Sequence, residues 1–375
     1  MKTRKYIFTI IFCLLFVSIS AQDFKTVQDG IEYAEVTRGT KEAPIHINLL
    51  KLDLKKVRLD VVHALDAAIG LEKTSSIASR HGAFAAINAG FFKMEGLYKG
   101  DAAGVLQIDR MLLSESYGNR TALFIDNNLS GKTDVFIEKL NVIDLVSVDK
   151  TEFEVGVNRK RGENDLVRFT QVFHQTTLTD PNGVEFIVRN KKVTKIIDGK
   201  GSSKIPQDGY VLSASGTKRD ELLKLLKVGI KLDWYVKSDS GTSNLRSYAF
   251  NQSEDIVAGV PQLIKDSKIA ITWQEEKIGK DFVETRHPRT AVAKLKDGKF
   301  LMVTVDGRQA GFSVGMNLNE LAEFLLEFGA TDAMNLDGGG STTMFLDGKL
   351  MNKPSDKEGE RSVSDAILVT LRNKK

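Results

Sequence analysis

Alternation of apolar and polar residues at a period of two dominates this chain of 375 residues. It is clearest at residues 46–54 and 57–62, where successive side chains would face the core and the solvent in turn. Helical spacing is much rarer. The pattern predicts an α+β fold of mixed or antiparallel sheets with few, irregularly placed helices.

Three segments carry helical patterns. The clearest covers 318–328, between Asn317 as N-cap and Gly329 as C-cap. A second helix is expected from about Asp220 to Val228. A third, shorter helix follows the capping candidates Thr74, Ser75 and Ser76 and ends near Gly82.

Residues 1–21 have the pattern of a secretory signal peptide. Lys2, Arg4 and Lys5 precede an uncharged apolar stretch at 6–19, which small residues follow. The apolar part is too short for comfortable membrane spanning, and no later stretch reaches the roughly 20 apolar residues of a transmembrane helix. We therefore expect an exported protein, periplasmic or secreted, without stable membrane insertion.

Composition after the predicted cleavage narrows the function classes. Cys13, the only cysteine, lies within the signal segment, so the mature chain would have no thiol chemistry and no cysteine-bound metal. Loss of residues 1–21 would lower the formal net charge from +4 to +1. Basic residues alternate with acidic ones and form no basic stripe. Nucleic acid and anionic membranes are not expected partners, and the oligomeric state is left open.

Domain organisation is predicted to be simple because no low-complexity linker interrupts the chain. We expect one domain over residues 22–375, with 126–285 as an elaboration of its core. The tripeptide Arg-Thr-Ala occurs at Arg120 and again at Arg289, each time at the head of a predicted strand. This repeat allows an internal duplication, but a chance match of three residues in a chain of this length is the favoured explanation.

The run from Met334 to Met344 carries the strongest chemical signal. In it Gly338, Gly339 and Gly340 separate Asn335 and Asp337 from the hydroxyls of Ser341 and Thr342. Successive backbone N–H groups in such a run form a concave site for an anion, which predicts phosphate recognition. Taken alone, a glycine cluster is more often a tight turn. No lysine of a nucleotide-binding P-loop follows it.

Other polar clusters stand where apolar strand patterns end. The candidate ligand-binding side chains are Asn88, Arg289, Arg308 and Arg361, the arginines because a guanidinium offers phosphate a bidentate donor pair. A single such arginine more often pairs with a surface carboxylate. Three beside strand ends and glycine turns favour a phosphate clamp, with His287 as a further candidate.

Asp306, Asp337 and Glu360 are the candidate general acid, general base or nucleophile, because a carboxylate pair is the usual equipment for cleaving a glycosidic bond. Turn formation is the alternative for Asp306, which precedes a glycine. Asp347-Gly348 is interpreted as a plain hairpin turn. No required cofactor is predicted. A Ca²⁺ or Mg²⁺ site at Asp306, Asp337 and Asn335 ranks below a metal-free site.

Together these motifs resemble the phosphodiester glycosidase family. The matching segments, in order, are Asn88–Phe92, Pro288–Ala291, Asp306–Gln309, Asn335–Met344, Asn352–Asp356 and Glu360-Arg361. The resemblance covers about residues 45–370. One departure is Ala89, where many family members carry a second glycine.

The resemblance implies hydrolysis of the bond between a sugar's anomeric carbon and a phosphodiester, releasing free sugar and a phosphomonoester. N-acetylglucosamine is one candidate sugar, and surface or dietary glycans are the expected substrates. The arginines would hold the phosphate. Our own hypothesis makes Asp337 and Glu360 the catalytic carboxylates. Two alternatives stay open: a phosphodiesterase that cleaves the phosphorus–oxygen bond, and a phosphoglycan-binding protein without turnover.

Overall fold

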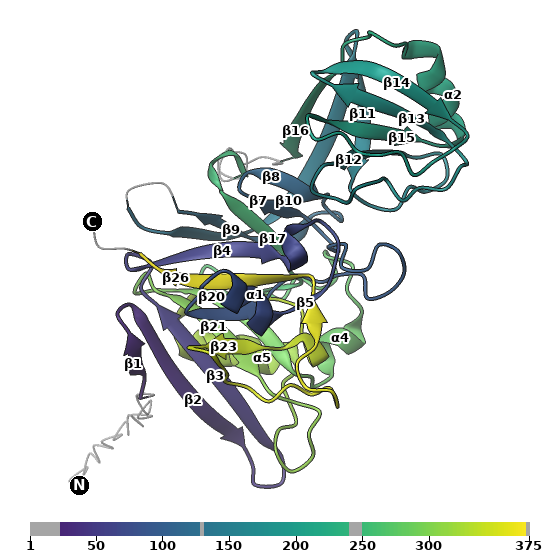
Figure 1. The fold of residues 1–375 in the computed structure, drawn as a ribbon. Coiled ribbons are helices and arrows are strands. Elements are labelled where there is room, and N and C mark those ends of the chain that lie inside the picture. The colour runs from purple at the N-terminus through teal and green to yellow at the C-terminus, as the bar shows by residue number, and fades with distance from the viewer. Residues whose placement is uncertain (1–22, 128–130, 240–249, 373–375) are drawn as a thin grey trace, which may run out of the picture.

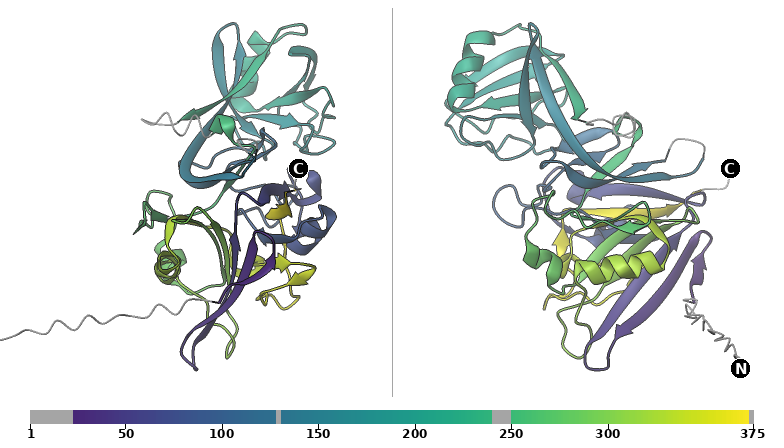
Figure 2. Two further views of the ribbon diagram at one scale, coloured as in Figure 1. Left: turned by 90° about the vertical axis from the view of Figure 1, so that its left-hand side faces the viewer. Right: turned by 180° about the vertical axis from the view of Figure 1, so that it is seen from behind.

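The computed structural model describes residues 23–127, 131–239 and 250–372, so the predicted signal peptide lies outside the described residues. The chain forms a larger lower lobe and a smaller upper lobe (Figure 1). The strand β10 (Asp134–Val148) is long enough to run from one lobe into the other. The same two lobes are separate in both further views (Figure 2).

An eight-stranded antiparallel sheet forms the centre of the lower lobe. Its strands, in spatial order, are β1 (Lys25–Gln28), β2 (Ile31–Gly39), β3 (Pro44–Leu52), β21 (Phe300–Val305), β20 (Arg289–Leu295), β22 (Ala330–Asn335), β18 (Gln262–Lys265) and β19 (Lys268–Ile269). The predicted strands at 46–54 and 57–62 are confirmed as β3 and β4 (Val57–His63).

A five-stranded sheet packs on one face of the first. Its strands, in spatial order, are β24 (Lys349–Leu350), β23 (Met344–Leu346), β6 (Ala85–Asn88), β26 (Asp365–Leu371) and β4. Leu50 and Met302 of the first sheet share one buried core with Ile87 and Ile367 of the second. Short strands β5 (Glu72–Lys73) and β25 (Ser362–Val363) pair beside this sandwich.

Helices cover the outer faces of the sandwich. Helix α5 (Leu318–Glu327) buries Leu321 and Leu325 against the eight-stranded sheet, near the short helix α4 (Lys280–Glu284). Helix α1 (Thr74–Arg80) packs on the five-stranded sheet. Two one-turn helices are η1 (Ala64–Asp66) and η2 (Gly339–Ser341).

The third sheet links the lobes. Its path is β14 (Lys192–Asp198), β13 (Val184–Arg189), β15 (Gly209–Ala214), β12 (Leu166–Thr170), β11 (Thr151–Val157), β10, β9 (Arg120–Asp126), β17 (Asp255–Ala258), β7 (Leu106–Ile108) and β8 (Met111–Ser114), with β16 (Asp233–Asp239) beside β10. Phe186 and Leu212 of this sheet and Leu222 of α2 (Gly216–Leu225) form a separate core in the upper lobe.

The predicted α+β class with few helices is confirmed. The helix at 318–328 is confirmed as α5, where Asn317 and Glu320 form a capping box. The helix expected at 220–228 instead starts four residues earlier, because Ser215 takes the extended N-cap conformation, and it ends where Leu226 becomes extended. The capping candidates 74–76 lie inside the first turn of α1, whose N-cap is Lys73.

The predicted elaboration at 126–285 divides between the lobes. Strands β11 to β15 belong to the upper lobe, whereas β18 and β19 lie in the eight-stranded core sheet. The two Arg-Thr-Ala segments do head strands, since Arg120 begins β9 and Arg289 begins β20.

Candidate functional site

The glycine run leaves β22 and folds back against two other segments of the lower lobe. Leu336 N–H donates to the Thr290 carbonyl at 2.8 Å, and Gly339 N–H donates to the Pro288 carbonyl at 2.9 Å. Asp337 N–H donates to the Ala89 carbonyl, also at 2.9 Å. The run is therefore fixed across the start of β20 and the end of β6, and it is more than a surface turn.

At each glycine of the run, a neighbouring group occupies the space that a side chain would need. A Cβ atom at Gly338 would lie 2.7 Å from the Pro288 carbonyl oxygen, and one at Gly339 would lie 3.0 Å from Arg308 Nη1. A Cβ atom at Gly340 would overlap Arg361. The absence of side chains thus allows two of the three predicted arginines to approach the backbone of the run.

Arg289, the third arginine, is deeply buried. It is 1% exposed, and its guanidinium donates to the carbonyls of Met316 at 3.0 Å, Phe282 at 2.7 Å and Thr285 at 2.8 Å. Its Cζ lies 4.9 Å from the Phe282 ring centroid. Burial, with a smaller contribution from Arg308, lowers its pKa to about 10. Arg289 fixes the surrounding loops and adds positive charge behind the run.

His287 and Arg308 extend this positive region. Arg308 Nε and Nη2 lie 3.3 and 3.1 Å from His287 Nδ1, so this nitrogen accepts from the guanidinium. Burial, then Arg308 and Arg289, lower the pKa of His287, which keeps the ring neutral. Within the described part of the chain, Arg289 and Arg308 form no ion pair with a carboxylate. Two guanidinium groups without a counter-charge suit an anionic ligand.

Arg361 differs because it has an internal partner. Its Nε and Nη2 donate to Asp356 at 2.7 and 2.9 Å in a bidentate pair that packs against Gly340. This geometry orients the guanidinium towards the run and partly neutralises its charge.

Asp337 lies at the head of the run and is partly buried. Burial raises its pKa to about 6, and Asp365 adds to the rise. The Ser341 hydroxyl, the Gly338 N–H group and Arg361 act in the opposite direction. A carboxyl group with such a pKa exchanges protons close to neutral pH, as a general acid or base must.

Asp306 is the second carboxyl group in this region. It is 2% exposed and accepts from Lys353 N–H at 2.9 Å and Asn352 Nδ2 at 3.3 Å. Burial raises its pKa to about 6. Asn352 also donates to the Thr342 carbonyl at 2.9 Å, so it connects Asp306 with the end of the run. Sequence reasoning used Asn352 only within a motif and gave it no role in the site.

Glu360 has a structural contact that the sequence does not reveal. It accepts from Ser75 N–H at 2.8 Å and from Ser75 Oγ at 2.5 Å, in the first turn of α1. Among the described residues, no hydrogen bond or ion pair joins Glu360 to the glycine run. The structure therefore brings Asp337, Arg308 and Arg361 to the run and places Glu360 at a helix end.

The two predicted asparagines lie behind the run. Asn88 is 1% exposed and accepts from Thr290 Oγ1 and Thr343 N–H. Asn335 is fully buried and donates to the carbonyls of Val260 at 2.6 Å and Leu336 at 2.8 Å. Both side chains hold the loops in place.

Unpartnered buried polar atoms gather around the run. Among the described residues, Asn335 Oδ1, Thr342 Oγ1 and Thr343 Oγ1 are buried without a hydrogen-bond partner. Buried polar groups nearly always have partners in folded proteins. A cluster of exceptions beside cationic groups is consistent with a polar ligand site.

Asp365 is a buried carboxyl group that sequence reasoning missed. It accepts from Gly90 N–H at 2.5 Å and from Ser364 Oγ at 2.6 Å, and burial raises its pKa against the influence of His63. Its position at the start of β26 carried no motif. Its charge state acts on Asp337 through space.

Neither a metal site nor a membrane span emerges in the described ranges. No three His, Cys, Asp or Glu side chains come close enough there to hold a metal ion. No described helix is long and apolar enough to cross a membrane.

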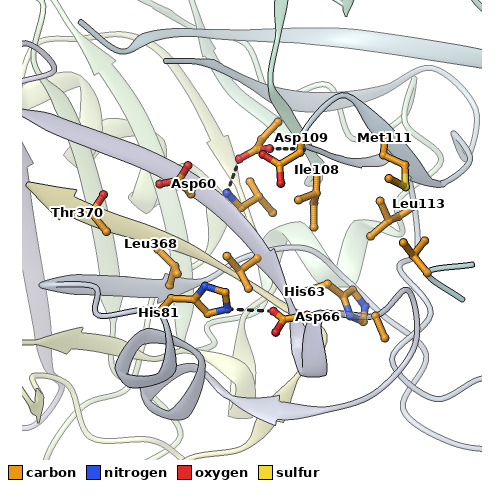
Figure 3. A pocket seen from close by; sticks show the side chains of 15 residues that line it. Asp60, His63, Asp66, His81, Ile108, Asp109, Met111, Leu113, Leu368 and Thr370 are labelled. Carbon is orange, nitrogen blue, oxygen red and sulfur yellow. Dashed lines mark hydrogen bonds and ion pairs between the residues drawn. The ribbon is translucent and has the colours of Figure 1, made fainter. Parts of the chain in front are cut away.

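A cavity of about 440 Å³ lies away from this chemistry, beside β4 and β26 (Figure 3). Asp60, His63 and Asp109 line it, but none of the predicted site residues does. Asp255, also in its wall, accepts from Val61 N–H at 2.7 Å and Asp109 N–H at 2.9 Å, which ties β17 to β4 and the β7–β8 turn. We place the candidate site at the glycine run, where cationic and acidic groups converge.

Comparison with solved structures supports the fold. A hypothetical protein from Synechocystis superposes with a TM-score of 0.79 at 23% identity, over 94% of this chain and 64% of that one. The zebrafish N-acetylglucosamine-1-phosphodiester alpha-N-acetylglucosaminidase catalytic domain, auto-inhibited by its pro-peptide, gives a TM-score of 0.51 at 18% identity, over 93% of this chain and 86% of that one. At these identities the likeness concerns the fold alone.

Sequence comparisons also find an N-acetylglucosamine-1-phosphodiester alpha-N-acetylglucosaminidase. The mouse N-acetylglucosamine-1-phosphodiester alpha-N-acetylglucosaminidase is 28% identical over 179 residues, which are 45% of this chain and 33% of the mouse protein. An uncharacterized protein from Rickettsia conorii is 27% identical over 61% of this chain and 77% of its own length. This chain thus spans about a third of the mouse enzyme.

The family comparison covers the half of the chain that contains the site. The sequence model of the phosphodiester glycosidase family matches residues 182–370, from the upper lobe through the glycine run to β26. The chain belongs to the phosphodiester glycosidase family.

Proposed function

We propose that this protein hydrolyses the bond between a sugar's anomeric carbon and a phosphodiester, releasing free sugar and a phosphomonoester. The observation that carries the proposal is the convergence of Arg308 and Arg361 on Gly339 and Gly340, with Asp337 at the head of the same run. Family membership supports the same reaction class.

The chemistry follows from charge. A water oxygen attacks the anomeric carbon, the bond from that carbon to the phosphate oxygen breaks, and its electron pair stays on the phosphate. Arg308 and Arg361 stabilise the charge on the departing phosphate. Asp337 accepts the proton of the attacking water, and Asp306 is the second carboxyl group to test.

Two arguments indicate the substrate class. The name of the mouse relative makes N-acetylglucosamine the first sugar to test. The predicted signal peptide supports a location outside the cytoplasm, in the periplasm or secreted. Sugars linked through phosphate in surface polysaccharides or dietary glycans are therefore the proposed substrates.

A product assay tests the reaction. The protein without residues 1–21 is incubated with a panel of sugar-1-phosphodiesters, beginning with N-acetylglucosamine-1-phosphodiesters. We expect free sugar and phosphomonoester, with loss of both in Asp337→Asn and a strong reduction in Arg308→Gln. Arg219→Gln is the matched control, because Arg219 pairs with Asp198 on the upper lobe surface at 2.7 Å.

Oxygen-18 water identifies the broken bond. Label in the released sugar supports cleavage at the anomeric carbon. Label in the phosphate would instead support a phosphodiesterase. Binding of the phosphodiesters without any product would support a phosphoglycan-binding protein.

A further inference from the structure

A second cavity, of about 340 Å³, lies where the lower lobe meets the start of the upper one. Its walls come from the loop after β6, the segment after β8 and the residues after β11. Phe92, Tyr117 and Arg159 are among the residues that line it. Its size falls in the range of small-molecule sites, roughly 300–1,000 Å³.

The cations that line this cavity all have carboxylate partners. Lys93 Nζ lies 3.2 Å from Asp101, and Arg159 donates to Glu115 at 2.6 Å and to Asp165 at 2.5 and 3.1 Å. Paired charges offer little net attraction to an ion, but their remaining lone pairs and N–H groups form hydrogen bonds. The lining therefore suits a ligand that is polar and uncharged.

Tyr117 supplies an aromatic surface beside these polar groups. Its side chain is 64% exposed although Arg120 Cζ lies 4.4 Å from the ring centroid. A tyrosine ring next to carboxylates and a guanidinium can pack against the apolar face of a sugar ring while its neighbours bind the hydroxyls.

The cavity is connected to the candidate site through one loop. Gly90, which donates to Asp365, lies against the Ala258 carbonyl, and Gly104 of the cavity wall lies against the Ala258 side chain. The next residue, Phe91, has its ring 6.1 Å from that of Phe282, the ring against which Arg289 packs. The loop after β6 thus lines the cavity and also contacts Phe282, which lies beside Arg289.

We propose that this cavity binds a neutral pyranose unit of a longer glycan whose phosphate-linked sugar occupies the glycine run. The inference rests on the proposed function, which supplies the phosphate-linked sugar at the glycine run. It adds that the protein recognises sugar on more than one side of the Phe91–Phe92 loop, and hence acts on an oligomer or polymer in preference to a single sugar phosphate.

The binding test needs no turnover. The protein without residues 1–21 is titrated calorimetrically with uncharged pyranose tetrasaccharides built of N-acetylglucosamine, glucose or mannose. We expect at least one to bind, with affinity reduced 10-fold or more in Tyr117→Ala and in Asp101→Asn. Tyr117→Phe keeps the ring and should keep the affinity. Phe136→Ala, which removes a 41% exposed aromatic side chain outside the cavity, is the control.

The outcomes separate this inference from the proposed reaction. No binding by any tetrasaccharide, or equal binding by the parent chain and Tyr117→Ala, overturns the subsite. Free sugar released from a sugar-1-phosphodiester would still support the reaction in that case. Conversely, tetrasaccharide binding that depends on Tyr117 supports the subsite even if no phosphodiester is cleaved.

Discussion

Asn88 Nδ2 donates a hydrogen bond of 2.7 Å to the backbone carbonyl of Asp337, 249 residues further along the chain. The Oδ1 atom of the same asparagine accepts from Thr290 Oγ1 at 2.8 Å and from Thr343 N–H at 3.0 Å. One buried amide thus connects β6 with both ends of the glycine run and with β20. The position of Asp337 depends on this side chain.

Asn88→Ala should therefore lower both stability and activity. It leaves the Asp337 carbonyl, the Thr290 hydroxyl and the Thr343 N–H group without their partner, at a cost of about 2–4 kcal/mol in the free energy of unfolding. Urea unfolding measures the cost, and Asn119→Ala, at an exposed position, should stay within about 0.5 kcal/mol of the parent. An unchanged unfolding midpoint in Asn88→Ala would contradict this role.

Alanine substitutions along the run should separate binding from folding. At Gly340 the new Cβ meets the ends of two flexible side chains, Arg361 and Asp356, so Gly340→Ala should weaken phosphodiester binding with little loss of stability. At Gly338 it meets the rigid Pro288 carbonyl at 2.7 Å, so Gly338→Ala should destabilise the fold. Gly279→Ala, where nothing lies within 4 Å, is the neutral control. Equal stability loss at Gly338 and Gly340 would contradict this assignment.

Glu360→Gln tests the role of Glu360, for which the sequence indicates catalysis and the structure a hydrogen bond that supports the fold. From the sequence we propose Glu360 as a catalytic carboxylate, whereas both of its oxygens accept from Ser75. From the geometry we expect a loss of about 0.5–1.5 kcal/mol in unfolding free energy and retention of most turnover. Turnover is measured on the phosphodiester that the parent cleaves. Loss of turnover without loss of stability would restore the catalytic assignment.

Asp255 should make stability depend on pH. Burial raises its pKa to about 7, above the roughly 3.9 of an unfolded aspartate. The folded state therefore binds the proton more tightly, so its contribution to stability is full below pH 4 and is lost as the pH rises through 7. Asp255→Asn cannot titrate, and its unfolding free energy should decline less between pH 4 and 7 than that of the parent. Parallel curves would exclude Asp255 as the source.

Local signals explain which parts of the fold were predictable. The capping box at Asn317 and the period of α5 lie within a few residues, as does the hairpin between β23 and β24, where Asp347 and Gly348 both have positive φ as expected for the turn. The start of α2 was missed because Ser215 was not recognised as its N-cap. The stacking of two sheets across one core depends on pairings far apart in sequence, which period alone does not give.

The sequence predicted the motifs of the site but not the role of each residue in it. The glycine run and Arg308 were found because glycines and arginine have recognisable chemistry at strand ends. The structural contact of Glu360 depends on Ser75, 285 residues away, and that of Asn335 on the Val260 carbonyl. Asp365 was missed because a carboxyl group acquires its raised pKa from burial, which only tertiary packing creates.

The activity should follow the ionisation of Asp337. Its pKa of about 6 means that the carboxylate, which accepts the proton of the attacking water, is lost as the pH falls through 6. We expect kcat/KM to rise roughly tenfold per pH unit below 6 and to level off above it. Arg361 lowers the pKa of Asp337, so Arg361→Gln should move the midpoint to higher pH besides weakening binding. Asp306→Asn, which removes the other carboxyl group with a pKa of about 6, should leave the midpoint in place if Asp337 is the base. A midpoint that disappears in Asp306→Asn and does not respond to Arg361→Gln would transfer the role of base to Asp306.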